Sequence, residues 1–247
     1  MATPVLDAPP EGVERIIYRD TMVQGAPLQL AMDIYQPSGQ STAGAVLIWF
    51  HAGAFVSGSI QAPGHRSLAR WLGGQGMTLV VPQYRLNADR SDLGPEVSDK
   101  LKALHKMRMP GFRKSLSAVK SLAALEDGLA ALDWVESQRQ SIGIDGKIVL
   151  GGSSAGAITA LNMVHTAPFI GYLTPAVGGV ISYSGGYPYP DLYRAGHVPV
   201  FAVHNPADDR VDIASIRQVA ARDPLAELIE APEQAHGAYF LSKGEPR

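Results

Sequence analysis

Short apolar runs that alternate with helical patterns constrain the fold of this 247-residue chain more than any other feature. The runs are rich in Val, Ile and Leu, which is typical of strands that are covered on both faces of a parallel sheet. They span residues 45–50, 78–84, 147–150, 177–183 and 198–203. Between them, apolar residues recur every three or four positions, notably over residues 65–72, 119–137 and 155–165. Strands that alternate with helices predict an α/β fold.

The residues before this pattern predict an antiparallel hairpin. Apolar and polar side chains nearly alternate over residues 13–20 and 28–35, and Gly25 lies between the two stretches. We expect the hairpin at one edge of a mostly parallel sheet with helices on both faces. A chain of this length fits within one α/β domain. We therefore predict an irregular arm over residues 1–12 and a single domain over residues 13–247.

The composition argues against several classes of protein. A formal net charge of −2 provides no overall field that would attract nucleic acid or an anionic membrane. The absence of cysteine excludes disulfides, a thiolate nucleophile and thiolate metal ligands. The sequence contains no unbroken run of about 18 apolar residues, the length that a membrane-spanning helix requires. The N-terminus lacks the pattern of a secretory signal, so we expect a cytoplasmic protein. No cluster of histidines and carboxylates has metal-ligand spacing.

A candidate nucleophile lies between one expected strand and the next helix. Residues 152–156 read GSSAG, which matches G-x-S-x-G, the pattern of a nucleophile elbow. Small neighbours permit the tight turn that projects the serine, and the amides at the start of the helix face developing negative charge. Small residues also permit an ordinary close turn, but the flanking strand and helix favour the catalytic interpretation. Ser154 is therefore the candidate nucleophile.

The segment after the strand at 45–50 carries a resemblance to a known family. It reads HAGAF over residues 51–55 and continues as VSGS. This stretch resembles the HGGG oxyanion loop of the hormone-sensitive-lipase-like carboxylesterases, and the longer run IWFHAGAFVSGS is similar to that of small feruloyl and acetylxylan esterases. These enzymes belong to the α/β-hydrolase superfamily. The resemblance implies an α/β-hydrolase fold for this chain.

The resemblance also implies an oxyanion hole made of backbone amides. It assigns this role to the amides of Gly53, Ala54 and Ala155, and such donors contribute about 3 to 4 kcal/mol each in other enzymes. Ala52 and Ala54 stand where the family has glycine, so a positive φ at either position would cost about 1 to 3 kcal/mol. His51 is expected to support this loop rather than to transfer protons.

The acid of a catalytic triad is expected after the strand at 198–203. The family pattern H-G-x-x-D-x-x-V aligns with His204, Asn205, Asp208 and Val211, which implies that Asp208 is the acid. Asn205 departs from the glycine of the pattern. The adjacent Asp209 therefore remains an alternative, and Asp212 is a weaker one that suits the cap of a following helix.

The base is expected near the C-terminus, after a strand-like stretch over residues 225–230. Residues 235–240 read AHGAYF and resemble the terminal H-G-F segment of the family. The order serine, acid, histidine is the order of this fold. His236 is the expected base, which accepts the proton of Ser154 while Asp208 holds the histidine tautomer.

Two regions bear on the choice of substrate. Phe55, Ser153, Tyr187 and Tyr189 are candidate substrate contacts, although aromatic residues in turns more often cover a core. Residues 100–120 contain seven Lys or Arg and no Asp or Glu. The surrounding stretch 89–117 looks like an insertion and is a lid candidate, while a solvated charged helix is the simpler interpretation.

These motifs predict a serine carboxylic-ester hydrolase that works through a Ser-Asp-His triad and an acyl-enzyme. The expected partner is a small-molecule ester, no cofactor or metal is required, and a homo-oligomer is compatible with the sequence. An arylformamidase-like amidase is an alternative, because the same triad cleaves amides. A ligand-binding protein without catalysis is a further alternative, since a fold does not determine a function.

Overall fold

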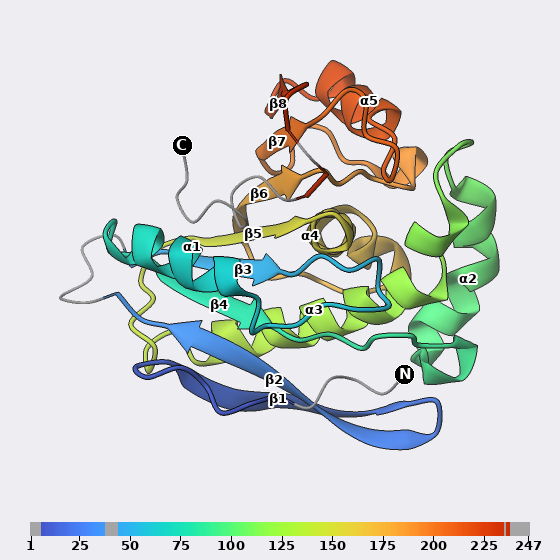
Figure 1. Cartoon of the computed structure of the whole chain (residues 1–247). Helices are drawn as coiled ribbons and strands as arrows, with labels where there is room; N and C mark the ends of the chain where they lie inside the picture. The colour runs from blue at the N-terminus through green and yellow to red at the C-terminus, as the bar shows by residue number, and fades with distance from the viewer. Residues whose placement is uncertain (1–5, 38–43, 235, 238–247) are drawn as a thin grey trace.

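The structure, a computed structural model, describes residues 6–37, 44–234 and 236–237 (Figure 1). Within these ranges eight strands form one sheet, in the order β1-β2-β4-β3-β5-β6-β7-β8. The strands are β1 (Glu14–Val23), β2 (Ala26–Tyr35), β3 (Val46–Phe50), β4 (Thr78–Pro82), β5 (Ile148–Ser153), β6 (Val177–Tyr183), β7 (Val200–His204) and β8 (Ala226–Glu230). The α-helices are α1 (Pro63–Gly73), α2 (Pro95–Met107), α3 (Val119–Ser137), α4 (Ala155–His165) and α5 (Ala214–Arg222). Short 3₁₀ turns span Arg90–Asp92, Lys114–Leu116, Ala167–Ile170 and Pro190–Leu192.

The N-terminal hairpin is confirmed. Strands β1 and β2 pair antiparallel, and β2 continues the antiparallel arrangement against β4. Gln24 and Gly25 form the turn with φ values of 50° and 76°, which suits the twist of a two-residue hairpin loop. Strands β3 to β8 pair in parallel. The predicted α/β class, with a mostly parallel sheet and an antiparallel N-terminal hairpin, is therefore confirmed.

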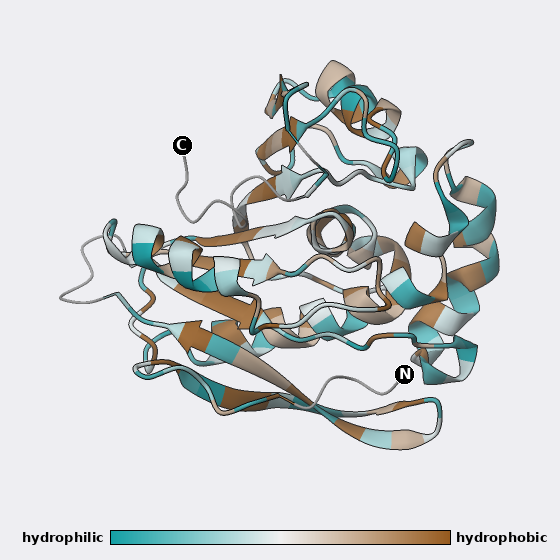
Figure 2. Cartoon of the chain, in the orientation of Figure 1, coloured by the Kyte–Doolittle hydropathy of each residue, from teal (hydrophilic) through white to brown (hydrophobic). Residues whose placement is uncertain are grey.

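Alternate side chains of the central strand β3 enter two cores. Val46, Ile48 and Phe50 belong to the larger core, which also contains buried residues of α3 and α4. Leu47 and Trp49 belong to a smaller core on the α1 side of the sheet. Each such side chain contributes about 1.5 to 3 kcal/mol when it is fully buried. Figure 2 shows hydrophobic residues along the strands of the sheet. Helices cover both faces of the sheet, as the sequence predicts.

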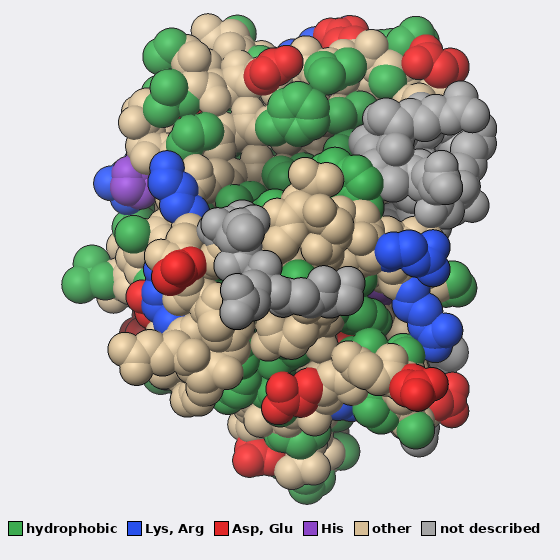
Figure 3. Space-filling view, turned by 90° about the vertical axis from the view of Figure 1, so that its left-hand side faces the viewer, with side chains coloured by type: hydrophobic (Ala, Val, Ile, Leu, Met, Phe, Trp, Pro, Cys, Tyr) green, Lys and Arg blue, Asp and Glu red, His purple; other side chains and the backbone are tan. Residues whose placement is uncertain are grey.

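The cover on the α1 side is thinner over strands β6 to β8. Ile181, Tyr183 and Phe201 are only partly buried there, and Ile229 is 43% exposed. The parallel registers pair Ile181 with Phe201, which places both side chains on one face. Figure 3 shows hydrophobic side chains around a hollow on the side of the molecule that faces left in Figure 1.

The stretch 89–117, for which a lid and a solvated charged helix were both considered, contains α2, and the helix expected after Asp212 is α5. Val97, Leu101 and Leu104 of α2 are buried at helical spacing and pack into the larger core, while the lysines between them remain outside. The basic residues between these apolar residues make the helical pattern of α2 difficult to recognise in the sequence. Among the helices of the described ranges, none combines the length and the apolar character that crossing a membrane requires.

Candidate active site

Ser154 occupies a strained turn between β5 and α4. Its backbone has φ 53° and ψ −115°, a conformation that costs a non-glycine residue about 1 to 3 kcal/mol. The Ser154 amide donates to the carbonyl oxygen of Tyr183 at 2.8 Å, and its own carbonyl accepts from the Ile158 amide at 3.1 Å. The neighbouring strand and the first turn of α4 therefore hold the strained conformation.

The two glycines of the GSSAG motif are required by close backbone packing. A Cβ atom at Gly152 would lie 2.4 Å from the carbonyl carbon of Gly156. A Cβ atom at Gly156 would lie 2.0 Å from the carbonyl oxygen of Phe50 and 2.8 Å from that of His51. All three distances are far below van der Waals contact. The start of α4 therefore packs directly against the loop that follows β3.

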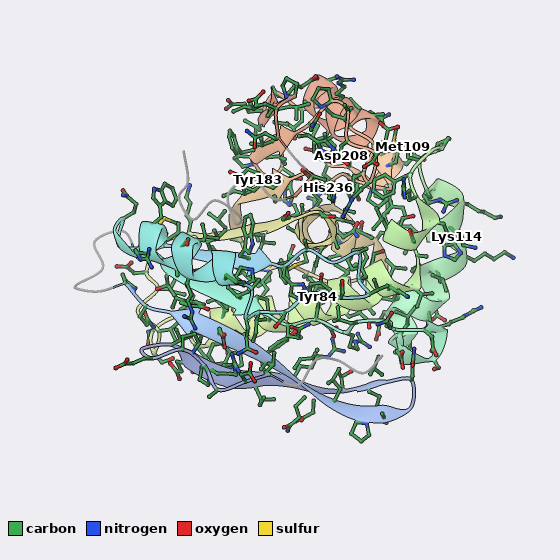
Figure 4. The ribbon with its side chains drawn as sticks, viewed as in Figure 1. Tyr84, Met109, Lys114, Tyr183, Asp208 and His236 are labelled. Carbon is green, nitrogen blue, oxygen red and sulfur yellow. The ribbon has the colours of Figure 1, made fainter. Side chains whose placement is uncertain are left out.

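The structure brings Ser154, Asp208 and His236 together from three separate loops. His236 Nε2 lies 2.9 Å from Ser154 Oγ, and His236 Nδ1 lies 2.6 Å from Asp208 Oδ2. Figure 4 shows His236 beside Asp208 above α4. When Nδ1 carries the proton and donates to Asp208, Nε2 is left as the acceptor for the serine hydroxyl. This is the arrangement that a serine nucleophile and its general base require.

The Asp208 carboxylate is buried and accepts several hydrogen bonds from the protein. Its side chain has 0% exposure, and Oδ1 accepts from the amides of Arg210 at 2.8 Å and Val211 at 3.1 Å. Burial by itself would raise the pKa of Asp208, but the hydrogen bonds from His236 and these amides lower the pKa below its usual value. Asp208 is therefore charged at neutral pH, and its Oδ2 faces His236 Nδ1.

The geometry favours Asp208 over the two alternative acids. The backbone carbonyl of Asp209 accepts a hydrogen bond from the Arg113 guanidinium. Asp212 Oδ1 accepts from the Ala214 amide at 2.8 Å, at the start of α5. The contact to the histidine is made by Asp208.

His204 lies beside Asp208, and the sequence motif assigns His204 no role. It is buried, its Nε2 lies 2.9 Å from the Val211 carbonyl oxygen, and the same nitrogen lies 3.4 Å from Asp208 Oδ2. Burial lowers the pKa of His204, so its ring is neutral at neutral pH. A neutral ring does not compete with His236 for the charge of Asp208.

Two serines hold the loop that carries His236. Ser153 Oγ donates to the carbonyl oxygen of Gly237 at 2.8 Å, and the Gly237 amide donates to Ser184 Oγ at 3.0 Å. Ser153 was predicted as a substrate contact, and the structure shows its hydroxyl engaged in this bond. Ser184 was not singled out from the sequence, because it is distant in the chain and belongs to no motif.

Replacement of Ser153 by Ala is expected to lower kcat about ten-fold while leaving the melting temperature nearly unchanged. The lost hydrogen bond is worth only about 1 kcal/mol, but a small displacement of a catalytic group has a larger effect on rate than on stability. Steady-state kinetics and thermal unfolding measure the two effects. Ser141→Ala, which removes a local bond to Gln138 far from this loop, is the matched control. An unchanged kcat for Ser153→Ala would contradict the positioning role.

The loop after β3 contains three successive residues with positive φ. The values are 131° at Gly53, 53° at Ala54 and 63° at Phe55. A Cβ atom at Gly53 would lie 1.9 Å from the Ser57 carbonyl oxygen, so glycine is required there. Of the two alanines considered in the sequence, Ala54 bears the strain and Ala52 does not.

The amides assigned to the oxyanion hole make no hydrogen bond within the part of the chain that the structure describes. Gly53 N, Ala54 N and Ala155 N donate no hydrogen bond to any residue in the described ranges. The carbonyl oxygen of Gly53, in contrast, accepts from the amides of Val56 and Ser57, each at 3.0 Å. The loop therefore satisfies the Gly53 carbonyl internally, whereas these three amides act as an oxyanion hole only if a ligand accepts from them.

His51 contacts this loop and packs against Tyr84. Its Nδ1 lies 2.7 Å from the Ala52 carbonyl oxygen, and its ring stacks on Tyr84 with a centroid distance of 4.2 Å. The Tyr84 hydroxyl donates to the His51 carbonyl oxygen at 2.8 Å. Burial lowers the pKa of His51 to about 4, so the ring is neutral at neutral pH. These contacts agree with a supporting place for His51.

The aromatic candidates for substrate contact are deeply buried. Tyr187 is 1% exposed, and its hydroxyl lies 3.0 Å from Thr166 Oγ1. Tyr189 is fully buried, and its hydroxyl donates to the Ser117 carbonyl oxygen at 2.8 Å. Phe55 is also fully buried. Satisfied hydroxyls and complete burial favour core packing for both tyrosines over contact with a substrate.

No cluster of three or more His, Asp or Glu side chains in the described part of the chain is placed to hold a metal ion.

Comparison with known proteins identifies the fold. A family model described as the alpha/beta hydrolase fold matches residues 112–187. The apo form of esterase 2 from Thermogutta terrifontis is 21% identical, with a TM-score of 0.66 over 97% of this chain and 91% of that chain. The chain has the α/β-hydrolase fold. The α/β-hydrolase fold that the motifs imply is thereby confirmed.

A second structure of the same esterase and one curated protein are also similar to this chain. The propionate-bound form of the Thermogutta terrifontis esterase is 21% identical, with a TM-score of 0.66 over 97% of this chain and 90% of that one. Cholinesterase 1 of Branchiostoma lanceolatum is 33% identical over 132 residues, which are 52% of this chain and 30% of that protein. The chain thus spans less than a third of the length of this relative.

Proposed function

We propose that this α/β hydrolase is a serine carboxylesterase that hydrolyses small-molecule esters through an acyl-enzyme. The contact chain from Ser154 Oγ through His236 to Asp208, with distances of 2.9 and 2.6 Å, carries the proposal. The strained turn at Ser154 and the unused amides of the oxyanion loop support it. The esterase and cholinesterase names among the similar proteins support esters as the substrate class.

Acylation begins when Ser154 Oγ forms a bond to the ester carbonyl carbon and its proton passes to His236 Nε2. The π electrons of the carbonyl move to its oxygen, which accepts hydrogen bonds from the amides assigned to the oxyanion hole. The tetrahedral intermediate then collapses and the bond to the alcohol oxygen breaks. The leaving oxygen takes the proton from His236, and Asp208 stabilises the imidazolium between the two transfers.

Deacylation repeats these steps with water as the nucleophile. The water oxygen bonds to the acyl carbon while its proton passes to His236 Nε2, and a second oxyanion forms in the same hole. The bond from the acyl carbon to Ser154 Oγ then breaks, and Oγ recovers the proton as the carboxylic acid leaves. General acid-base transfer of this kind is worth about 100- to 10,000-fold in rate.

The proposal is tested with wild-type protein on the 4-nitrophenyl esters of acetate, butyrate and octanoate, and on formanilide as an amide. We expect turnover of at least one ester, with an initial burst of nitrophenol if deacylation is slow, and a rank order that measures the acyl site. Hydrolysis of formanilide alone would replace the esterase with an arylformamidase-like amidase. Binding of esters without release of nitrophenol would favour a ligand-binding protein.

A further inference from the structure

We propose that Asn87 is a positioning residue that holds the oxyanion loop in its strained conformation. The inference rests on the proposed esterase function, because it concerns the same loop. Three successive positive φ values over residues 53–55 disfavour this conformation in a free peptide. The surrounding structure must therefore hold the loop, and Asn87 makes the contacts that do so.

Asn87 binds two consecutive carbonyl groups of this loop. Its backbone amide donates to the Phe55 carbonyl oxygen at 2.9 Å, and its side-chain Nδ2 donates to the Val56 carbonyl oxygen at 3.0 Å. Phe55 and Val56 are the two residues that follow Gly53 and Ala54, whose amides are assigned to the oxyanion. Two bonds at neighbouring peptide units restrain the orientation of those units, and with it the direction of the amides before them.

Asn87 is itself held from the opposite side. Lys120 Nζ, at the start of α3, donates to Asn87 Oδ1 at 3.2 Å. Gln24 Nε2, in the hairpin turn, donates to the Asn87 carbonyl oxygen at 2.8 Å. All four polar groups of Asn87 are therefore bonded, and they connect the oxyanion loop to a helix and to the hairpin.

The residue type suits this place. Asn87 has φ 59°, a left-handed conformation that asparagine tolerates better than most other residues. A lysine ammonium can only donate, so Lys120 requires the amide oxygen of Asn87 to face it. The NH₂ group of Asn87 is then directed to the Val56 carbonyl. Lys120 is one of the seven basic residues of the stretch 100–120, and its ammonium group orients the side-chain amide of Asn87 through this contact.

Three variants separate this positioning role from general stability. Asn87→Gly keeps the positive φ and the backbone bond to Phe55 but removes both side-chain bonds. Asn87→Asp keeps an acceptor for Lys120 but places an oxygen opposite the Val56 carbonyl oxygen, which repels it. Lys120→Met removes only the group that orients the asparagine amide.

We expect kcat for a 4-nitrophenyl ester to fall about ten-fold in Asn87→Gly, further in Asn87→Asp, and about three-fold in Lys120→Met, with KM nearly unchanged. An alkyl trifluoromethyl ketone, which forms a tetrahedral adduct with the serine and places an oxyanion in the hole, measures the geometry directly. Its inhibition constant is expected to rise in proportion to the fall in kcat/KM. A residue that only stabilised the fold would move the melting temperature without this proportionality.

Lys102→Met, a change at an exposed lysine of α2 in the same basic stretch, is the matched control, and we expect it to leave all three constants unchanged. Folded Asn87 and Lys120 variants with wild-type kcat would overturn the inference. So would a fall in kcat without a parallel change in the inhibition constant. A wild-type protein that hydrolyses no ester would overturn the proposed function as well, whereas an active wild type with unaffected variants would overturn the inference alone.

Discussion

Replacement of Ser154 by Ala is expected to abolish ester turnover, with kcat lower by about a million-fold, the size of effect that removal of a triad nucleophile has in another serine hydrolase. The reason is that Oγ is the atom that bonds to the acyl carbon, and no other hydroxyl contacts His236 in the described part of the chain. Burst and steady-state release of 4-nitrophenol measure the loss. Ester binding is expected to persist, because the oxyanion amides remain.

The same substitution has a small expected effect on stability. Ser154 loses one hydrogen bond, to His236, and alanine must adopt the same positive φ that serine already adopts. Thermal unfolding within a few degrees of wild type would show that lost activity reflects lost chemistry. Equal nitrophenol release by wild type and Ser154→Ala would refute Ser154 as the nucleophile.

Replacement of Asp208 by Asn is expected to lower kcat about 10,000-fold, the effect of the corresponding change in another serine hydrolase. The carboxylate accepts the Nδ1 proton of His236, whereas an amide NH₂ in its place donates to Nδ1 and leaves the proton on Nε2. A protonated Nε2 cannot accept the proton of Ser154. Steady-state kinetics at neutral pH measure the loss.

Asp209→Asn is the matched control for this result, because the adjacent side chain makes no contact to the histidine within the described ranges. We expect its kcat to stay within about three-fold of wild type, as for a change at an exposed position away from the chemistry. A large loss in Asp209→Asn with a near-normal Asp208→Asn would reverse the assignment of the acid.

The Asp208 variant also has an expected dependence of stability on pH. The folded-state pKa of Asp208 lies below its unfolded value, so its charge stabilises the fold above the unfolded pKa of about 4. This contribution is lost as the pH falls through the lower, folded-state pKa. The stability difference between wild type and Asp208→Asn is therefore expected to shrink in acid, which denaturant unfolding at a series of pH values measures.

The order and type of most elements could be read from the sequence because burial imposes a period on the chain. The strands at 46–50 and 78–82 are apolar throughout most of their length, since both faces of the sheet are covered there. The bounds and the buried face of helix α2 could not be predicted, because lysines separate Val97, Leu101 and Leu104 and the apolar face is recognisable only once the surface it contacts is present. The end of β5 was missed for a related reason, because residues 151–153 are small and show no apolar pattern.

Local motifs predicted the residues of the candidate site whose constraints lie within a few positions of one another. Gly152 and Gly156 flank Ser154 because the turn and the start of α4 leave no room for a Cβ atom, and such short-range packing leaves a pattern in the sequence. The choice between Asp208 and Asp209 stayed open at that level. Neighbouring carboxylates are chemically alike, and only the position of His236 distinguishes them.

The sequence by itself thus determined the α/β class, the hairpin and the candidate serine, because periodic burial and tight turns are encoded over short stretches. The family resemblance added the candidate histidine and narrowed the acid to a few neighbouring carboxylates. The tertiary structure alone decided which side chains hold that site in place. Ser184 contacts Gly237 across 53 positions, and Asn87 contacts Val56 across 31 positions and Lys120 across 33. Contacts over such separations follow from the packing of whole elements, and a single sequence carries no local pattern for them.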